Sequence, residues 1–202
     1  MSAHPSSGPE PERALPRIGI DLQVRKAGTA DVALIRELAG RSWHAFYPGM
    51  ISMPQIHYML RQMYSPRRLQ ADLLRGARYF VAETGDRPIG FLGCDPTPEP
   101  THASGQPLVL QRFYLVPEFQ GRGYGAVLLG WLEEHARGLG LDRIRLRVNK
   151  HNHRALRAYR RAGYRLVDAL IEDIGEGHVM DDYVLERRVA GSPEWRRPGA
   201  GP

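Results

Sequence analysis

The sequence predicts an α/β domain with a partly antiparallel sheet, and three observations support this prediction. Apolar residues recur with strand and helix periods in the order strand, helices, three strands, helix, strand, helix and two strands. Glycines, prolines and polar clusters separate these segments where turns are needed. The chain has 202 residues, 42% of them hydrophobic and 25% charged, which suits one globular domain.

The N-terminal part of this domain is expected to hold one strand and three helical segments. Residues 22–24 mark a short strand, and Thr29 is the expected N-cap of the first helix. A second helical stretch runs from residue 54 to about residue 64. Ser65 and Pro66 then place an N-cap before a first-turn proline, which predicts a third helix.

Three strands are expected in the middle of the chain. Strands at residues 78–83 and 88–94 form a hairpin, and residues 95–107 follow as a polar loop. The third strand covers residues 108–116. It ends at Pro117, because proline has no amide hydrogen to donate to a ladder.

The C-terminal part alternates helices and strands. A helix starts near Gly123, and a strand at residues 142–148 alternates Ile, Leu and Val with arginines. Asn152 is expected to cap the next helix. Residues 164–174 and 178–188 then form a terminal hairpin.

The two ends of the chain are expected to lie outside the folded domain. Residues 1–19 and 191–202 are rich in Pro, Ser and Gly, which indicates a disordered and a flexible tail around a domain at 20–190. No apolar run approaches the roughly 20 residues that span a bilayer, and no signal peptide is visible. We therefore expect a cytoplasmic protein without a membrane partner. The single cysteine, Cys94, is expected to be a buried strand residue, and no metal site is predicted.

The charge of the chain favours an anionic partner. The formal net charge is +6, and much of the basic charge falls between Arg143 and Arg165, where acids are almost absent. Aromatic residues are not interleaved with these arginines, and no nucleic-acid-binding motif is visible, so no nucleic acid is expected. A phosphorylated cofactor is the simpler partner. A solvated helix face remains the alternative for most of these arginines.

A glycine-rich turn, Gln120-Gly121-Arg122-Gly123-Tyr124-Gly125, separates a strand from a helix. Its glycines let the backbone approach a ligand, and the helix behind it offers unpaired amide hydrogens and the positive end of its dipole. Both features favour a phosphate. No Walker sequence follows, and the position where a Rossmann turn needs an acid falls among arginines. A tight turn without a ligand remains the alternative for this segment alone.

A second motif follows about 30 residues later, with the pattern N-x-x-A-x-x-x-Y-x-x-x-G-Y. It is formed by Asn152, Ala155, Tyr159, Gly163 and Tyr164. Together the two segments resemble the GCN5-related N-acetyltransferase (GNAT) superfamily, whose cofactor signature Q/R-x-x-G-x-G/A is matched by Gln120, Gly123 and Gly125. The resemblance extends from about residue 22 to residue 186. It implies a three-layer α/β enzyme with a mixed, mostly antiparallel central sheet that is splayed between the fourth and fifth strands.

The resemblance also implies roles for individual residues. Acetyl-CoA is the implied co-substrate, with its pantetheine arm lying in the splay. Tyr159 is implied to protonate the leaving thiolate, with core packing as the alternative. Asn152 is implied to contact pantetheine, although an N-cap alone also explains it. The residues implied to bind acetyl-CoA are Leu115, Val116, Gln120, Gly121, Arg122, Gly123, Tyr124, Gly125, Ala126, Asn152 and Tyr159.

The expected acceptor is a primary amine of a small molecule or peptide. Such an ammonium, with a pKa of ~10, must lose a proton before it attacks. Strand alternation puts Asp181 and Asp182 on opposite faces, and Asp182 is the expected base, with hairpin solvation as the alternative. A backbone amide near Val116 is expected to stabilise the oxyanion. Trp43 and Tyr47 fall between the first two helices, where this family builds its acceptor site; helix packing explains them equally well.

Two other functions remain open at this stage. One is a catalytically silent acetyl-CoA-binding module, against which the intact Tyr159 argues. The other is a basic nucleic-acid-binding protein, which predicts steeply salt-dependent binding. The sequence leaves open the acceptor amine, the length of the acyl chain, and the choice between a monomer and a homodimer.

Overall fold

A computed structural model describes residues 20–96 and 107–189 of the chain. The predictions of tails at 1–19 and 191–202, and most of the predicted loop at 95–107, lie outside the described residues. Among the described helices, none is both long and apolar enough to cross a membrane.

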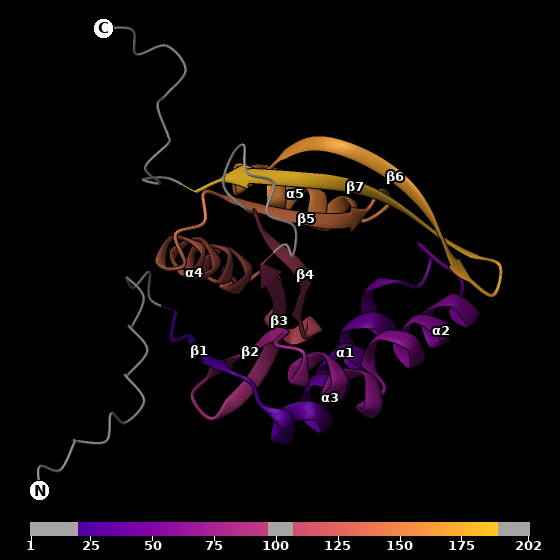
Figure 1. Ribbon diagram of the computed structural model, residues 1–202, viewed down its shortest axis with the longest axis horizontal. Helices are drawn as coiled ribbons and strands as arrows, with labels where there is room; N and C mark the ends of the chain where they lie inside the picture. Colours follow the sequence, from indigo (N-terminus) through magenta and orange to yellow (C-terminus); the bar gives the residue numbers. More distant parts are fainter. Residues whose placement is uncertain (1–19, 97–106, 190–202) are drawn as a thin grey trace, which may run out of the picture.

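The strands of the described residues form one sheet in the order β1-β2-β3-β4-β5-β7-β6 (Figure 1). Neighbouring strands are antiparallel except for β4 and β5, which are parallel, so the predicted mixed, mostly antiparallel sheet is confirmed. The strands are β1 (Gln23–Lys26), β2 (Arg78–Thr84), β3 (Arg87–Pro96), β4 (Pro107–Leu115), β5 (Arg143–Asn149), β6 (Arg165–Gly175) and β7 (His178–Arg188).

The helices begin and end close to the predicted positions. They are α1 (Val32–Phe46), α2 (Met53–Tyr64), α3 (Pro66–Leu74), α4 (Tyr124–Gly138) and α5 (His153–Arg161), with short 3-10 turns η1 (Thr29–Asp31) and η2 (Pro117–Phe119). The predicted cap of α3 is confirmed, because the Ser65 hydroxyl accepts a hydrogen bond from the Arg68 amide at 3.4 Å.

Two predictions around α1 were wrong. Thr29 does not cap the helix but begins the 3-10 turn before it, and Asp31 occupies the N-cap position. The Asp31 carboxylate instead accepts from the Gly28 amide at 2.9 Å and pairs with Arg25 at 2.8 Å, two contacts that hold the 3-10 turn before the helix. At the other end α1 continues to Phe46, so Trp43 lies in its last turn and not between the helices.

The helices cover both faces of the sheet and make three layers (Figure 1). On one face, the ring of Tyr64 in α2 packs against Phe91 of β3, with centroids 5.9 Å apart. On the other face, Trp131 of α4 packs against Phe80 of β2 at 4.8 Å. Tyr159 of α5 approaches Phe113 of β4 at 6.2 Å on the side of α4. Thus α1 to α3 form one outer layer, and α4 and α5 form the other.

The sheet opens between β4 and β5, as the resemblance implies. These strands pair only where Pro107–Leu110 faces Arg143–Leu146. Gln111, the next residue of β4, is the extra residue of a β-bulge against β3. Because a bulge bends its strand, β4 turns away from β5 where their pairing ends. Gly90 keeps the rest of β4 close to β3, since a Cβ there would collide with the Tyr114 carbonyl oxygen.

Candidate active site

The turn that joins β4 to α4 is shaped by Gly123. This residue occupies the N-cap position of α4 with φ of +90°, a left-handed conformation that favours glycine. No side chain caps the helix. A Cβ at this position would lie 2.8 Å from Cδ1 of Ile20. The helix therefore begins with its amide hydrogens open to a ligand.

The amide hydrogens of this turn fall into two groups. The amide of Gln120 donates to the Pro117 carbonyl at 3.2 Å, and the amide of Ala126 donates to the Gly123 carbonyl at 3.0 Å. Among the described residues, none accepts a hydrogen bond from the amides of residues 121–125. These five amides are therefore the ones left open to a ligand, a narrower set than the predicted range from Gln120 to Ala126.

Two arginines add positive charge near these amides. Arg154 of α5 reaches towards the turn, because its Nη2 atom would lie 3.7 Å from a Cβ on Gly121. The Arg122 guanidinium lies over the ring of Phe119, 5.9 Å from its centroid. The arrangement suits a diphosphate, since main-chain donors, a helix dipole and cationic side chains converge on one turn.

The end of β4 offers main-chain groups to the splay. The amide of Val116 donates to the Ile89 carbonyl at 2.9 Å, so this amide is not available for an oxyanion. Since amides alternate in direction along an antiparallel pair, the neighbouring Leu115 amide points away from β3 and into the splay. The Leu115 carbonyl accepts from Gln120 Nε2 at 2.8 Å, so the Gln120 side chain braces the strand end.

Helix α5 places Asn152 and Tyr159 on the other side of the splay. The Asn152 side chain accepts a hydrogen bond from the Ala155 amide at 3.0 Å, which confirms its predicted N-cap role. Tyr159 is buried, and its ring packs edge-on against Tyr164 at 5.5 Å. Burial, with a smaller contribution from Tyr164, raises the pKa of the Tyr159 phenol, so the hydroxyl keeps its proton at neutral pH.

The Asp182 carboxylate is buried and only half satisfied. Its Oδ2 atom lies 3.4 Å from Nε of Arg147, while Oδ1 has no hydrogen-bond partner among the described residues. Burial raises the pKa of Asp182, and Arg147 opposes that shift. Asp181 pairs with Lys150 on the opposite face of β7, as strand alternation predicts. A buried carboxylate oxygen without a donor is unusual and points to a missing cationic or N–H partner.

Aromatic side chains bring the acceptor-side residues together. Trp43 stacks on Tyr47 with centroids 4.2 Å apart, and the Tyr47 hydroxyl lies 3.4 Å from that of Tyr114. Burial raises the pKa of Tyr47 and the hydrogen bond with Tyr114 opposes that shift, while the nearby ionisable groups of Tyr159 and Asp182 add smaller contributions that raise it. The α1–α2 connection, α5 and β7 therefore contribute to one neighbourhood, although they are far apart in the sequence.

The tip of the β6–β7 hairpin is attached to α2, which the sequence did not predict. Gln55 Nε2 donates to the Val179 carbonyl at 2.7 Å, and the Tyr58 hydroxyl donates to the Ile174 carbonyl. Figure 1 shows the hairpin reaching across to α2. The spacing of Gln55 and Tyr58 marks an inner helix face, but it does not reveal the strand that this face contacts.

The known proteins that this chain resembles are N-acetyltransferases. The model of the acetyltransferase (GNAT) family matches residues 41–164. A spermidine N(1)-acetyltransferase of Thermoplasma acidophilum is 25% identical over 174 residues, which are 84% of this chain and 98% of that protein. An uncharacterized N-acetyltransferase of Methanocaldococcus jannaschii is 29% identical over 86 residues, but the match spans only 43% of this chain and 38% of that protein.

The fold also matches a solved structure. The crystal structure of PaiA N-acetyltransferase from Thermoplasma acidophilum in complex with coenzyme A superimposes with a TM-score of 0.69 and 24% identity. The superposition covers 84% of this chain and 99% of that chain.

Proposed function

The chain belongs to the acetyltransferase (GNAT) family, whose enzymes use acetyl-CoA as co-substrate, and from this premise we propose that it acetylates a primary amine of a cationic small molecule. The observation that supports this proposal most is the buried Oδ1 atom of Asp182, which has no partner among the described residues. An ammonium or amine N–H is the donor that this atom needs.

The donor half of the site fits acetyl-CoA. The amides of residues 121–125 and the Arg154 side chain suit its diphosphate. The Leu115 amide faces the splay, where β4 no longer pairs with β5. There it donates a hydrogen bond to pantetheine or to the acetyl group instead of to a neighbouring strand. The thioester supplies the activated acetyl group, and the residues of this chain orient it and move the protons.

Asp182 is proposed to take the proton that the ammonium must lose. Its pKa is raised by burial, which makes the carboxylate a better base than an exposed aspartate and brings its pKa closer to that of the amine. Arg147 holds the carboxylate through Oδ2, so Oδ1 remains free for the amine. The neutral nitrogen then attacks the carbonyl carbon.

Tyr159 and the Leu115 amide are proposed to stabilise the rest of the reaction. The Leu115 amide donates to the oxyanion that forms when the C–N bond is made. When the C–S bond breaks, the Tyr159 hydroxyl gives its proton to the leaving sulfur. The nitrogen is cationic once the C–N bond has formed, and it loses its second proton to solvent. Solvent also carries the proton of Asp182 away and returns one to Tyr159, so that one turnover gives the amide, coenzyme A and one released proton.

A polyamine is the first acceptor to test. The similar protein from Thermoplasma acidophilum is a spermidine acetyltransferase, and polyamines are flexible cations whose terminal ammonium suits a buried carboxylate. A peptide N-terminus is the other acceptor class. It needs main-chain partners in the acceptor half, whereas the half described above consists of a carboxylate and aromatic side chains.

The test is a thiol-release assay with acetyl-CoA against spermidine, spermine, amino acids, aminoglycosides and short peptides. We expect release with a polyamine, and loss of that release in Asp182→Asn while coenzyme A still binds. If no amine on the panel gives release although coenzyme A binds tightly, the chain is a silent binding module and the proposal is wrong. Release with peptides alone would refute the polyamine assignment.

A further inference from the structure

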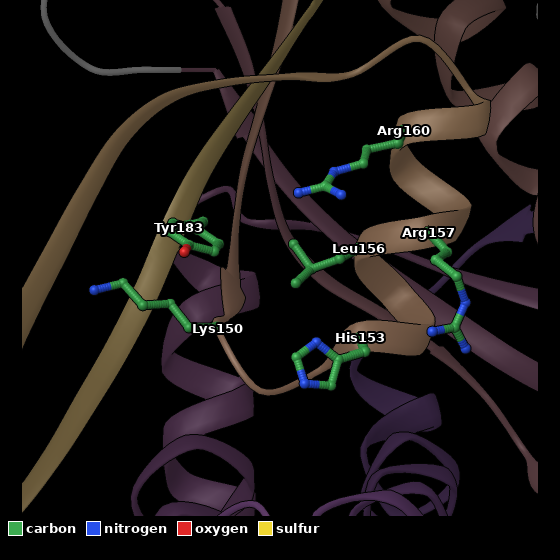
Figure 2. Close-up of a pocket in the computed structure, with 6 residues that line it drawn as sticks. All are labelled: Lys150, His153, Leu156, Arg157, Arg160 and Tyr183. Carbon is green, nitrogen blue, oxygen red and sulfur yellow. The ribbon is translucent and has the colours of Figure 1, made fainter.

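A cavity of about 320 Å³ lies between α5 and β7, outside the proposed active site (Figure 2). It is lined by Lys150, His153, Leu156, Arg157, Arg160 and Tyr183. Figure 2 shows Leu156 and Arg160 projecting from α5 towards the ring of Tyr183 on β7. Leu156 is buried and supplies an apolar wall, while Arg157 and Arg160 of α5 supply positive charge.

The two arginines of this cavity, Arg157 and Arg160, lack anionic partners among the described residues. The acid beside it, Asp181, is already paired with Lys150, and α5 contains no acid. Among the described residues, Arg157 and Arg160 have neither an ion pair nor a side-chain hydrogen bond partner, and both are exposed. Like charges three or four residues apart destabilise a helix. A bound anion would remove that repulsion.

The cavity is separate from the diphosphate seat. His153, Leu156, Arg157 and Arg160 follow one another at helical spacing and share one face of α5. Arg154 lies on a different face, where it approaches Gly121. Two faces of the same short helix thus carry arginines that form no ion pair with the described residues, and only the face of Arg154 belongs to the proposed donor site.

We propose that this cavity is a second binding site, for a small phosphorylated ligand. Arginine guanidinium groups match phosphate oxygens with paired N–H donors, and the His153 imidazole adds a third donor at the start of α5. Leu156 and Tyr183 accommodate an apolar or flat part of the ligand. The volume is at the lower end for small-molecule sites and suits a ligand of mononucleotide size. The proposal does not depend on which amine is acetylated.

The test is calorimetry on the full chain saturated with coenzyme A, so that the donor site is filled. The probes are AMP, inorganic phosphate and adenosine. We expect one equivalent of AMP to bind, phosphate to bind more weakly, and adenosine to give no heat. Arg160→Gln and Arg157→Gln should each weaken AMP binding about tenfold or more, the loss of one charge-assisted contact.

The matched control is Arg67→Gln, which removes the same charge from an exposed arginine on α3 and should leave AMP affinity unchanged. Two exposed arginines are tested separately, so a folding defect in one variant leaves the other to decide. The proposal is overturned if the saturated protein gives no heat with millimolar AMP, or if adenosine binds as well as AMP. It is also overturned if Arg67→Gln weakens binding as much as the cavity variants do.

Discussion

The two halves of the proposed active site are built from different chemical groups. The donor half uses main-chain amides of residues 121–125 and of Leu115, which come from consecutive elements. The acceptor half uses the side chains of Tyr47, Tyr159 and Asp182, which come from the α1–α2 connection, α5 and β7. We infer that substitutions in the donor half act mainly on cofactor affinity through backbone shape, whereas substitutions in the acceptor half act mainly on rate.

The largest effect is expected from Asp182→Asn. Removing the base should lower kcat roughly 10²–10⁴-fold without changing affinity for coenzyme A. The Asp181→Asn variant is the control, because Asp181 pairs with Lys150 on the opposite face, and it should retain near-normal kcat. Steady-state kinetics with the best acceptor amine measures both. Equal losses in the two variants would show that hairpin charge, not a base, matters.

The same variant also tests stability. Because burial raises the pKa of Asp182, the folded state holds this proton more tightly than the unfolded state does. The stability that this group contributes is present below the unfolded pKa and is lost as pH rises through the folded pKa. Above the folded pKa the charged carboxylate therefore costs stability, and Asp182→Asn should not lower Tm there. A clear drop in Tm would contradict this account.

Tyr159→Phe should lower kcat by about 10²-fold, at the low end for a general acid, because water can also protonate the leaving sulfur. Affinity for acetyl-CoA should change little, since the ring and its packing against Phe113 remain. Tyr164→Phe, which alters the ring next to it, is the matched control. Unchanged kcat in Tyr159→Phe would refute the general-acid role and leave Tyr159 with a packing role only.

Gly123→Val should act on the donor half alone. The left-handed φ of +90° is strained for a branched residue, and its Cβ would meet Ile20, so the turn must change shape. Strain of about 1–3 kcal/mol corresponds to roughly a 10–10²-fold loss of coenzyme A affinity, measured by calorimetry. Full affinity in a folded variant would refute the main-chain seat. Gly138→Val, at the far end of α4, serves as the control.

A smaller effect, on stability, is expected from removing the side-chain cap at the N-terminus of α5, for which the N-terminus of α4 has no equivalent. Asn152→Ala removes the side-chain cap of α5 and should destabilise the fold by about 1 kcal/mol, measured by urea unfolding. Gly123, at the start of α4, offers no side-chain cap to lose. If Asn152→Ala lowers coenzyme A affinity without lowering stability, its role is ligand contact and not capping.

The smallest effect is a displacement of the pH profile. Arg147 lowers the pKa of Asp182 against the effect of burial. Arg147→Gln should therefore raise that pKa and move the acid limb of kcat/KM to higher pH. The profile is measured with one acceptor amine in both proteins, so that the amine's own titration cancels. A limb that moves to lower pH would exclude Asp182 as the titrating group.

Local rules predicted the glycine turn, the strand end and the helix caps. The glycine turn, the Ser65 and Asn152 caps and the end of β4 each depend on hydrogen bonds within a few residues. The start of α1 was misplaced because a 3-10 turn precedes the helix, with the Asp31 side chain bound to Gly28 and Arg25. Likewise, the Val116 amide is occupied by a carbonyl of β3, which sequence spacing does not reveal.

The acceptor half could be predicted only in part. Strand alternation separated Asp182 from Asp181, but it gave no sign that Arg147 would hold one oxygen of Asp182. The attachment of α2 to the hairpin tip through Gln55 and Tyr58 joins residues more than 100 positions apart in the chain. Such contacts form only when distant segments come together in the folded sheet, so no local sequence pattern predicts them.

The short pairing of β4 with β5 has a mechanical consequence. Among the described residues, only the stretch from Pro107 to Leu110 ties the two blocks of the sheet together by strand pairing. We expect these blocks to separate first when the molecule is unfolded by force or opens locally by thermal fluctuation. Amides of β5 next to the opening should then exchange early with deuterium. A thioester bound between β4 and β5 would connect the two blocks of the sheet. We therefore expect the sheet to unfold as one cooperative unit only while the acetyl donor is bound.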